Sequence, residues 1–288
     1  MDVRFYKYHG LGNDYLVIPP SALSASLTPD QVRAVCHRHY GLGSDGILLG
    51  PTASDGHDFS VRIFNPDGSE AEKSGNGLRI FARHLWEQGL VGTEPFTINT
   101  TGSSARATVH AGGSPISLDM GRVSFQAADI PVKDETGEVL NRVRNLGGQS
   151  LTWCAATIGN PHCVVLCDEI SRDLALQLGP ALETDAAFPN RANVQLLKII
   201  DRRNIALEVW ERGVGYTLAC GSAASVGAAT ARRLDLCDPQ IRVHMPGGRL
   251  DITINKDYSV QLTGPVTKIA EGHILPELFE YFLHHHGK

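Results

Sequence analysis

The hydrophobic and polar positions of the chain alternate mostly with the period of β-strands, and a few segments follow the period of helices. Runs rich in β-branched or aromatic residues and bounded by Gly, Asn, Asp or Pro are typical of strands; they read DYLVI, SVRIF, FTINT, ARATVH, CVVL, IALEVW, IRVHM and LDITIN. Helical spacing occurs at residues 28–38, 76–88, 170–178, 222–234 and 276–283. The pattern predicts a mixed α/β (α+β) fold.

The same pattern contains an internal repeat. Five landmarks recur in one order and in register to within one residue: Asn13 and Asn160, Gly46 and Asn193, Asn65 and Glu211, Ser74 and Cys220, Gly102 and Gly247. We therefore predict two copies of one fold, residues 1–118 and 150–265, joined by a connector at residues 119–149. The tail at residues 266–288 is expected to pack on the first copy.

A small nucleophile precedes a glycine-rich helix start in both copies, Ser74 in KSGNG and Cys220 in ACGS. Unpaired N–H groups and the helix dipole at such a start bind a carboxylate and lower the pKa of a thiol. Two copies related by a pseudo-twofold axis would let these residues approach one ligand from opposite sides of an interdomain cleft, which is a favoured place for ligands. This arrangement suits removal of a proton next to a carboxylate on one face and its replacement on the other, with no cofactor.

Each of these features also has an ordinary structural interpretation. A cysteine before a helix is commonly a small buried hydrophobe, and a serine before Gly-Asn-Gly is commonly a helix cap. Recurrence at matched register favours the functional interpretation, because a simple cap need not recur beside other polar landmarks. The spacings in His37-Arg38-His39 and of Cys163 and Cys167 match no strong metal-ligand pattern, so no metal site is predicted.

Composition narrows the class of protein. The 288 residues are 42% hydrophobic and 20% charged, as expected for about two globular domains. A net charge of −5 with scattered Lys and Arg argues against nucleic acid. No apolar run approaches the roughly 20 residues of a membrane span, and the N-terminal residues lack a signal-peptide core. Six irregularly spaced cysteines fit free thiols in a reducing compartment, so we expect a cytoplasmic location.

Longer motifs carry a family resemblance. HGLGNDY, GLGSDG, FNPDGSEAEKSGNG, IGNPH, NVQ, ERGVGYTLACGS and TGP follow one another as in diaminopimelate epimerase, a family of PLP-independent amino-acid epimerases, and the resemblance covers nearly the whole chain. It implies two pseudosymmetric domains, each a barrel-like β-sheet around a central helix, with the active site in the interdomain cleft. It also implies an isomerase that acts with a pair of cysteines on a small amino acid with a second polar end.

The resemblance assigns roles to individual residues. Cys220 matches one catalytic thiol, and Ser74 stands where the other is expected. The amino and carboxyl groups of the substrate would be held by Asn13, Asn65, Asn160, Asn193, Glu211 and Arg212. Helix-end N–H groups for the reacting carboxylate would come from Gly75, Asn76, Gly221 and Ser222. The ionisation of the thiols would be influenced by His162 and Glu211.

Several positions depart from the family pattern. Besides Ser74, Tyr216 occupies the usual acidic position of a GET run, and residues 222–225 replace a Thr-Gly-rich run. Gly46 removes a polar side chain that some members have beside the substrate. Ala270 stands where an aromatic residue is often placed near the family's dimer contact, so a homodimer is an expectation that these residues leave open.

The leading hypothesis is an LL-/meso-diaminopimelate epimerase of lysine and peptidoglycan-precursor biosynthesis, with Cys220 as thiolate base and Ser74 as proton relay. A racemase or epimerase of another amino acid, its pocket reshaped by Tyr216 and residues 222–225, is the main alternative. One-base dehydration or isomerisation at Cys220, a non-catalytic amino-acid-binding protein, and a serine introduced in place of a natural cysteine also remain open. Exchange of the Cα proton separates the enzymes from the binding protein.

Overall fold

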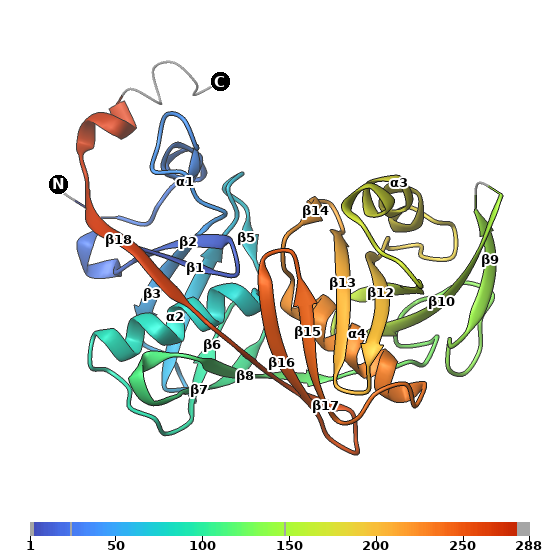
Figure 1. Ribbon diagram of the computed structural model, residues 1–288. Coiled ribbons are helices and arrows are strands. Elements are labelled where there is room, and N and C mark those ends of the chain that lie inside the picture. The colour runs from blue at the N-terminus through green and yellow to red at the C-terminus, as the bar shows by residue number, and fades with distance from the viewer. Residues whose placement is uncertain (1–2, 24, 147, 281–288) are drawn as a thin grey trace. The chain divides into compact units, whose positions relative to one another are not determined.

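A computed structural model describes residues 3–23, 25–146 and 148–280. The chain divides into two compact units, Met1–Leu118 with Gly264–Lys288, and Asp119–Thr263. Each unit contains strands and two main α-helices (Figure 1). Residues 119–149, for which the sequence predicts a connector, lie within the second unit.

The first unit is built from strands, two α-helices and two short 3-10 helices. In chain order they are β1 (Val3–Gly10), β2 (Asn13–Ile18), η1 (Pro20–Ala22), α1 (Pro29–Cys36), β3 (Ile47–Thr52), β4 (Phe59–Phe64), β5 (Glu70–Ala71), α2 (Gly75–Glu87), β6 (Phe96–Asn99), β7 (Ser104–Val109), η2 (Ala111–Gly113), the start of β8 (Ile116–Arg122) and β18 (Thr267–Ile274). The Thr28 side chain and the Gln31 side chain form a capping box at the start of α1, and Pro29 is its first residue.

The second unit holds the remaining elements. They are β9 (Arg142–Leu146), β10 (Gln149–Thr157), β11 (Pro161–Leu166), α3 (Arg172–Glu183), β12 (Asn193–Asp201), β13 (Asn204–Glu211), β14 (Gly215–Thr217), α4 (Gly221–Arg233), β15 (Gln240–Met245), β16 (Gly248–Ile254) and β17 (Ser259–Gly264).

Strand pairing in the two units follows one scheme. In the first unit β1–β2 is antiparallel, β2–β3 parallel, β3–β4 and β4–β5 antiparallel, β4–β6 parallel, and β6–β7–β8 antiparallel. In the second, β10 to β17 repeat these pairings and their directions in the same order. Even the flanking strands agree, because β18 pairs with β1 and β9 with β10. The internal repeat predicted from the five landmarks is therefore confirmed.

Alternate residues of a strand point to opposite faces of the sheet, so they pack against two different helices. In β3, Ile47 and Leu49 belong to the core under α1, whereas Leu48 lies against Gly77 of α2. In β13, Trp210 packs against Gly179 of α3, whereas Leu207 lies against Gly227 of α4. Each sheet is thus covered on one face by α1 or α3 and curves around α2 or α4 on the other (Figure 1).

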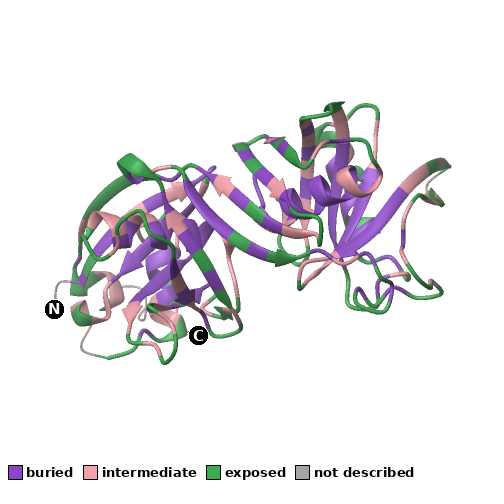
Figure 2. Cartoon of the chain, turned by 90° about the horizontal axis from the view of Figure 1, so that it is seen from below, coloured by how far each residue is buried: buried purple, intermediate pink, exposed green. Residues whose placement is uncertain are grey.

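The two central helices are buried over most of their length. Figure 2 shows buried residues concentrated along the strands and these helices. In α4, small Ala and Gly residues let the sheet approach closely; a Cβ added at Gly227 would lie 3.1 Å from the Leu207 side chain. Burying each large apolar side chain contributes about 1.5–3 kcal/mol, so these two layers supply much of the stability of each unit. The expected mixed fold, with two pseudosymmetric halves and a helix at the centre of each, is confirmed.

Some predicted elements have different ends in the structure. The helix expected at residues 170–178 starts at Arg172 and continues through Pro180 to Glu183, because Leu178 and Leu182 pack into the core of the second unit. That burial offsets the one backbone hydrogen bond that proline removes. The helix expected at 276–283 is present at residues 276–280, and residues 281–288 lie outside the described residues.

Candidate active site

Cys220 is the N-cap residue of α4 and is separated from the end of β14 by two residues. Its side chain is 7% exposed, and its Sγ lies 3.3 Å from the Ser222 Oγ. Although Sγ makes no capping hydrogen bond, the N–H of Ala223 in the first turn favours the thiolate form. A helix start with free N–H groups is a suitable place for negative charge.

The thiol of Cys220 is nevertheless held in its protonated form. Burial raises the pKa of Cys220 far above its usual range, and the neighbouring Glu211 carboxylate raises it further. Ser222 and the Ala223 N–H oppose this shift but do not overcome it. The lowered thiol pKa expected at this helix start is therefore wrong for this structure, because desolvation outweighs the helix N-terminus.

Glu211 connects the thiol to β14. Glu211 ends β13 and pairs with Gly215, and the Thr217 hydroxyl donates a hydrogen bond of 2.7 Å to Glu211 Oε1. Cys220, Glu211, Thr217 and Ser222 form one polar group, which we call the Cys220 cluster. A carboxylate beside a protonated thiol can accept its proton, so the cluster contains both a nucleophile and a base.

His162 is completely buried in β11 and joins two other side chains. Gln195 Nε2 donates to His162 Nδ1 at 2.7 Å, so Nε2 carries the ring proton and donates to Asn160 Oδ1 at 3.0 Å. Burial lowers the pKa of His162 to about 3, so the ring is neutral at physiological pH. In this structure His162 orients Asn160, and no hydrogen bond joins it to Cys220 among the described residues.

The side chain of Asn193 is hydrogen-bonded to the backbone of Arg212. Asn193 is buried; its Nδ2 donates to the Pro161 carbonyl at 3.1 Å, and its Oδ1 accepts from the Arg212 N–H at 3.0 Å. The Arg212 side chain is exposed and donates to the Asn190 carbonyl at 3.1 Å. Asn193 thus fixes the turn that presents Arg212, and its predicted direct contact with substrate stays a prediction.

Ser74 is the N-cap residue of α2, the position equivalent to Cys220. Its Oγ accepts a hydrogen bond from the Gly77 N–H at 3.0 Å and lies 3.2 Å from the Tyr15 hydroxyl. Gly75 opens the helix, as predicted. The Ser74 hydroxyl therefore caps the helix, which agrees with the ordinary structural interpretation of this serine. It also contacts the phenol of Tyr15, a residue that the sequence analysis did not single out.

A chain of amides leads from α2 to β2. Asn76 Nδ2 donates to Asn13 Oδ1 at 3.1 Å, and Asn13 Nδ2 donates to Asp45 Oδ2 at 2.9 Å. Fully buried Arg79 donates to Asn76 Oδ1 at 2.8 Å, while Arg38 holds Asp45 at 2.6 Å. The sequence reasoning missed Arg79 and Asp45; the i, i+3 spacing of Asn76 and Arg79 is the signal that could have found the first.

Asn65 stands apart from these contacts. It closes the turn after β4, where its Nδ2 donates to the Ser69 Oγ at 2.9 Å. No hydrogen bond joins it to Asn13 or Ser74 in the part of the chain that the structure describes. Its predicted role in binding substrate remains a prediction.

Tyr216 points away from the Cys220 cluster. It pairs with Trp210 across β13 and β14, and both rings pack on the core beneath α3. Its hydroxyl donates to Glu208 at 2.7 Å, and burial followed by this bond raises its pKa to about 12. The neighbouring Thr217 carries the side chain on the opposite face. The idea that Tyr216 reshapes the substrate pocket stays a prediction, and in this structure the Tyr216 side chain lies on the α3 face of the sheet.

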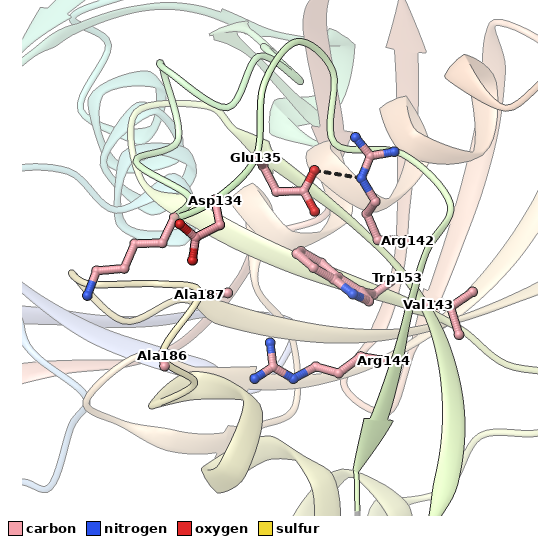
Figure 3. Close-up of a pocket in the computed structure, with 9 residues that line it drawn as sticks. Asp134, Glu135, Arg142, Val143, Arg144, Trp153, Ala186 and Ala187 are labelled. Atoms are coloured by element: carbon pink, nitrogen blue, oxygen red, sulfur yellow. Dashed lines mark hydrogen bonds and ion pairs between the residues drawn. The ribbon is translucent and has the colours of Figure 1, made fainter.

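A pocket of the second unit lies away from the Cys220 cluster. It has a volume of about 510 Å³ and is lined in part by Trp153, Ala187 and Arg142, which pairs with Glu135 at 2.7 Å (Figure 3). Arg144 at its wall pairs with Asp185. No residue predicted for the active site lines it. Within the described ranges no group of three metal-binding side chains is present, and no helix is long and apolar enough to cross a membrane.

Solved structures of other proteins have the same fold. A hydroxyproline epimerase from Agrobacterium vitis matches with a TM-score of 0.66 and 14% identity over 95% of this chain and 91% of that one. A predicted epimerase from Pseudomonas aeruginosa matches with a TM-score of 0.66 and 19% identity over 95% and 99%. Both of these solved structures share the fold of this chain.

Sequence comparison gives the family. The model of the family described as diaminopimelate epimerase matches residues 5–126 and 154–269. Diaminopimelate epimerase 2 of Nostoc sp. is 53% identical over 96% of this chain and 97% of its own length. Diaminopimelate epimerase of Stutzerimonas stutzeri is 38% identical over 95% and 99%. The chain belongs to the diaminopimelate epimerase family, whose members are isomerases.

Proposed function

We propose that this protein interconverts LL- and meso-diaminopimelate without a cofactor, with Cys220 as the base on one face of Cα and Ser74 as the proton donor on the other. The observation that carries the proposal is the matched placement of Cys220 and Ser74 as N-cap residues of α4 and α2 in two halves of one topology. The names of the relatives support the substrate. Such an activity belongs to lysine and peptidoglycan-precursor biosynthesis.

Cys220 must lose its proton before it can act. Glu211 is the nearby acceptor: transfer of the proton from Sγ to the carboxylate leaves a thiolate facing the first N–H groups of α4. The thiolate then takes the Cα proton, and the electron pair moves into the substrate carboxylate. N–H groups at the two helix starts, near Gly75 and Asn76 and near Gly221 and Ser222, would stabilise that charge.

Ser74 would complete the inversion by giving its hydroxyl proton to the opposite face of the carbanion. A hydroxyl is a far weaker acid than a thiol, but a Cα carbanion is a strong enough base to take its proton. The alkoxide that results has to be reprotonated before the next turnover. Ser74 therefore depends on a further proton source more than a cysteine at the same place would.

Arg212 suits the distant carboxylate of the substrate. Its guanidinium is exposed and forms no ion pair within residues 3–23, 25–146 and 148–280, so it is available for a bidentate contact. The amides of Asn13, Asn65, Asn160 and Asn193 would hold the amino and carboxyl groups near Cα. A cytoplasmic location and a homodimer belong to the proposal as well; all six cysteines are free thiols, which is consistent with a reducing compartment.

The test is to incubate the protein with LL-diaminopimelate in D₂O and to follow Cα deuteration and the meso isomer by NMR. We expect both, and we expect both to be lost in Cys220→Ala. Cys167→Ala is the matched control, because Cys167 is a thiol packed on the core of the second unit and should be dispensable.

Each failure has a distinct meaning. Deuteration without the meso isomer would contradict the role of Ser74 and leave a one-base enzyme. No deuteration in this protein or in Ser74→Cys would reject diaminopimelate as the substrate, and a panel of other amino acids would follow.

A further inference from the structure

Tyr15 reaches Ser74 from the neighbouring strand. In β2 the side chains of Asn13 and Tyr15 share one face, since alternate residues of a strand point the same way. Asn13 accepts a hydrogen bond from Asn76 of α2, and the Tyr15 hydroxyl lies 3.2 Å from Ser74 Oγ. Strand β2 therefore presents an amide and a phenol to the first turn of α2.

When Tyr15 is the donor in its hydrogen bond with Ser74, the proton of the Ser74 hydroxyl is free to be donated elsewhere. An aliphatic hydroxyl has one proton and two lone pairs. The Gly77 N–H uses one lone pair at 3.0 Å, and a Tyr15 hydroxyl that donates uses the other. In that arrangement the Ser74 O–H must point away from both neighbours. A serine with both lone pairs occupied is a hydroxyl set to give a proton.

Gly46 makes room for this phenol. A Cβ at Gly46 would lie 2.6 Å from Tyr15 Cε1 and 2.4 Å from the Phe64 carbonyl oxygen, which is closer than any real Cβ contact. Tyr15 is 6% exposed, so its ring cannot move into solvent without giving up its packing. The absence of a side chain at position 46, noted in the sequence, is thus required by both the Phe64 carbonyl and the Tyr15 ring.

We propose that Tyr15 is a positioning residue that supplies the proton delivered by Ser74, and that Gly46 fixes the Tyr15 ring for this purpose. The inference rests on the proposed epimerase function. The Ser74 O–H bond breaks as the proton moves to Cα, and the Tyr15 O–H bond breaks as its proton moves to Ser74 Oγ. A tyrosinate remains, and it takes a proton from water before the next turnover or serves as the acceptor in the reverse reaction.

Acidity explains why a serine needs this partner. The ordinary pKa of a phenol is about 10 and that of a cysteine thiol about 8.5, whereas an aliphatic alcohol is a much weaker acid. A cysteine at position 74 could exchange its proton with solvent unaided. A serine there would leave an unstable alkoxide unless a stronger acid reprotonated it at once.

Four proteins test the proposal: the natural sequence, Tyr15→Phe, Ser74→Cys and Tyr15→Phe/Ser74→Cys. Inversion of LL-diaminopimelate and Cα deuteration are measured in D₂O, together with KM. We expect Tyr15→Phe to lower the inversion rate by about 100-fold or more with little change in KM, which is the usual effect of losing a general acid. Deuteration through Cys220 should persist. In the Ser74→Cys background the same Tyr15→Phe change should have little effect.

A merely structural role of Tyr15 predicts equal losses in both backgrounds, and that outcome would overturn the proposal. An unchanged inversion rate in Tyr15→Phe would overturn it too. Gly46→Ala is the second variant: its Cβ would press on the Tyr15 ring and on the Phe64 carbonyl, so it should slow inversion more with Ser74 than with Ser74→Cys, and melting temperatures of all variants check the fold. Absence of inversion in the natural sequence would reject the epimerase proposal and this inference together, whereas inversion that survives Tyr15→Phe rejects this inference alone.

Discussion

The starts of α2 and α4 have the same backbone but different chemistry. Ser74 and Cys220 are N-cap residues with φ/ψ of −142°/114° and −137°/125°. The hydroxyl of Ser74 caps its helix and contacts a phenol, whereas the thiol of Cys220 makes no cap and lies beside a carboxylate. The two halves thus share one backbone conformation at this helix start, while Ser74 and Cys220 have different polar neighbours.

The largest effect should follow from removing the thiol. Cys220→Ala takes away the one group expected to abstract the Cα proton, and neither Ser74 nor Tyr15 is basic enough to replace it. We expect Cα exchange to fall by about 1,000-fold or more. NMR in D₂O measures it. If Cys220→Ala retained Cα exchange, the base would have to be a residue of the other half of the chain.

A smaller effect is expected from Thr217→Val, which keeps the shape of the side chain and removes its hydrogen bond to Glu211. The carboxylate then accepts the proton of Cys220 in an altered orientation. We expect kcat to fall by about tenfold, since a hydrogen bond to a charged group contributes about 1.5–3 kcal/mol. The measurement is the steady-state rate at saturating substrate. An unchanged kcat would contradict a role of Glu211 in the reaction.

A pH experiment compares the two halves through their buried histidines. Burial lowers the pKa of His84 in the first unit to about 4 and that of His162 in the second to about 3. The unfolded chain binds protons at these sites below its ordinary pKa of about 6.5, so the free energy of unfolding should fall as pH drops from there toward 4 and 3. The slope approaches about 1.4 kcal/mol per pH unit for each histidine.

Urea unfolding at several pH values measures this slope. His84→Gln and His162→Gln should each flatten it, and above pH 7 neither group should contribute to it. A slope that both substitutions leave unchanged would mean that other groups dominate the acid response.

The smallest effect is expected from Tyr216→Phe. This change removes a hydrogen bond to Glu208 on the α3 face, one residue away from Thr217. Because that face is turned away from the Cys220 cluster, kcat and KM should stay within about twofold, with stability lowered by about 1 kcal/mol. A large change in KM would bring Tyr216 back as a determinant of specificity.

The sequence could predict the repeat because glycines, asparagines and helix caps sit at the turns, where local chemistry decides the backbone. Asn13, Ser74 and Cys220 all fall at the starts of elements, as their register indicates. The end of α3 could not be placed this way, since Pro180 is a local signal for a break and the packing of Leu182 is not local.

The residues that neighbour the Ser74 hydroxyl and the Cys220 thiol could not be predicted from the sequence either. Tyr15 reads as an ordinary aromatic residue of a strand, and only the placement of β2 beside α2 brings its hydroxyl to Ser74. The pKa of Cys220 depends on competition between burial and the helix start, two effects of opposite sign whose balance the sequence does not contain. The role of Tyr216 was predicted from its place in a motif, whereas the alternation of side chains along β14 determines which face of the sheet Tyr216 lies on.

The first and last strands of the chain are neighbours in one sheet. β1 pairs with β18, and Leu278 and Phe279 pack on the same core as Leu16 and Ile18 of β2. The second unit, by contrast, is one uninterrupted stretch. On the ribosome the second unit can therefore finish folding while the first still lacks a strand. The half that is made first is the half that is completed last, and its β1 edge stays unpaired until β18 has been made.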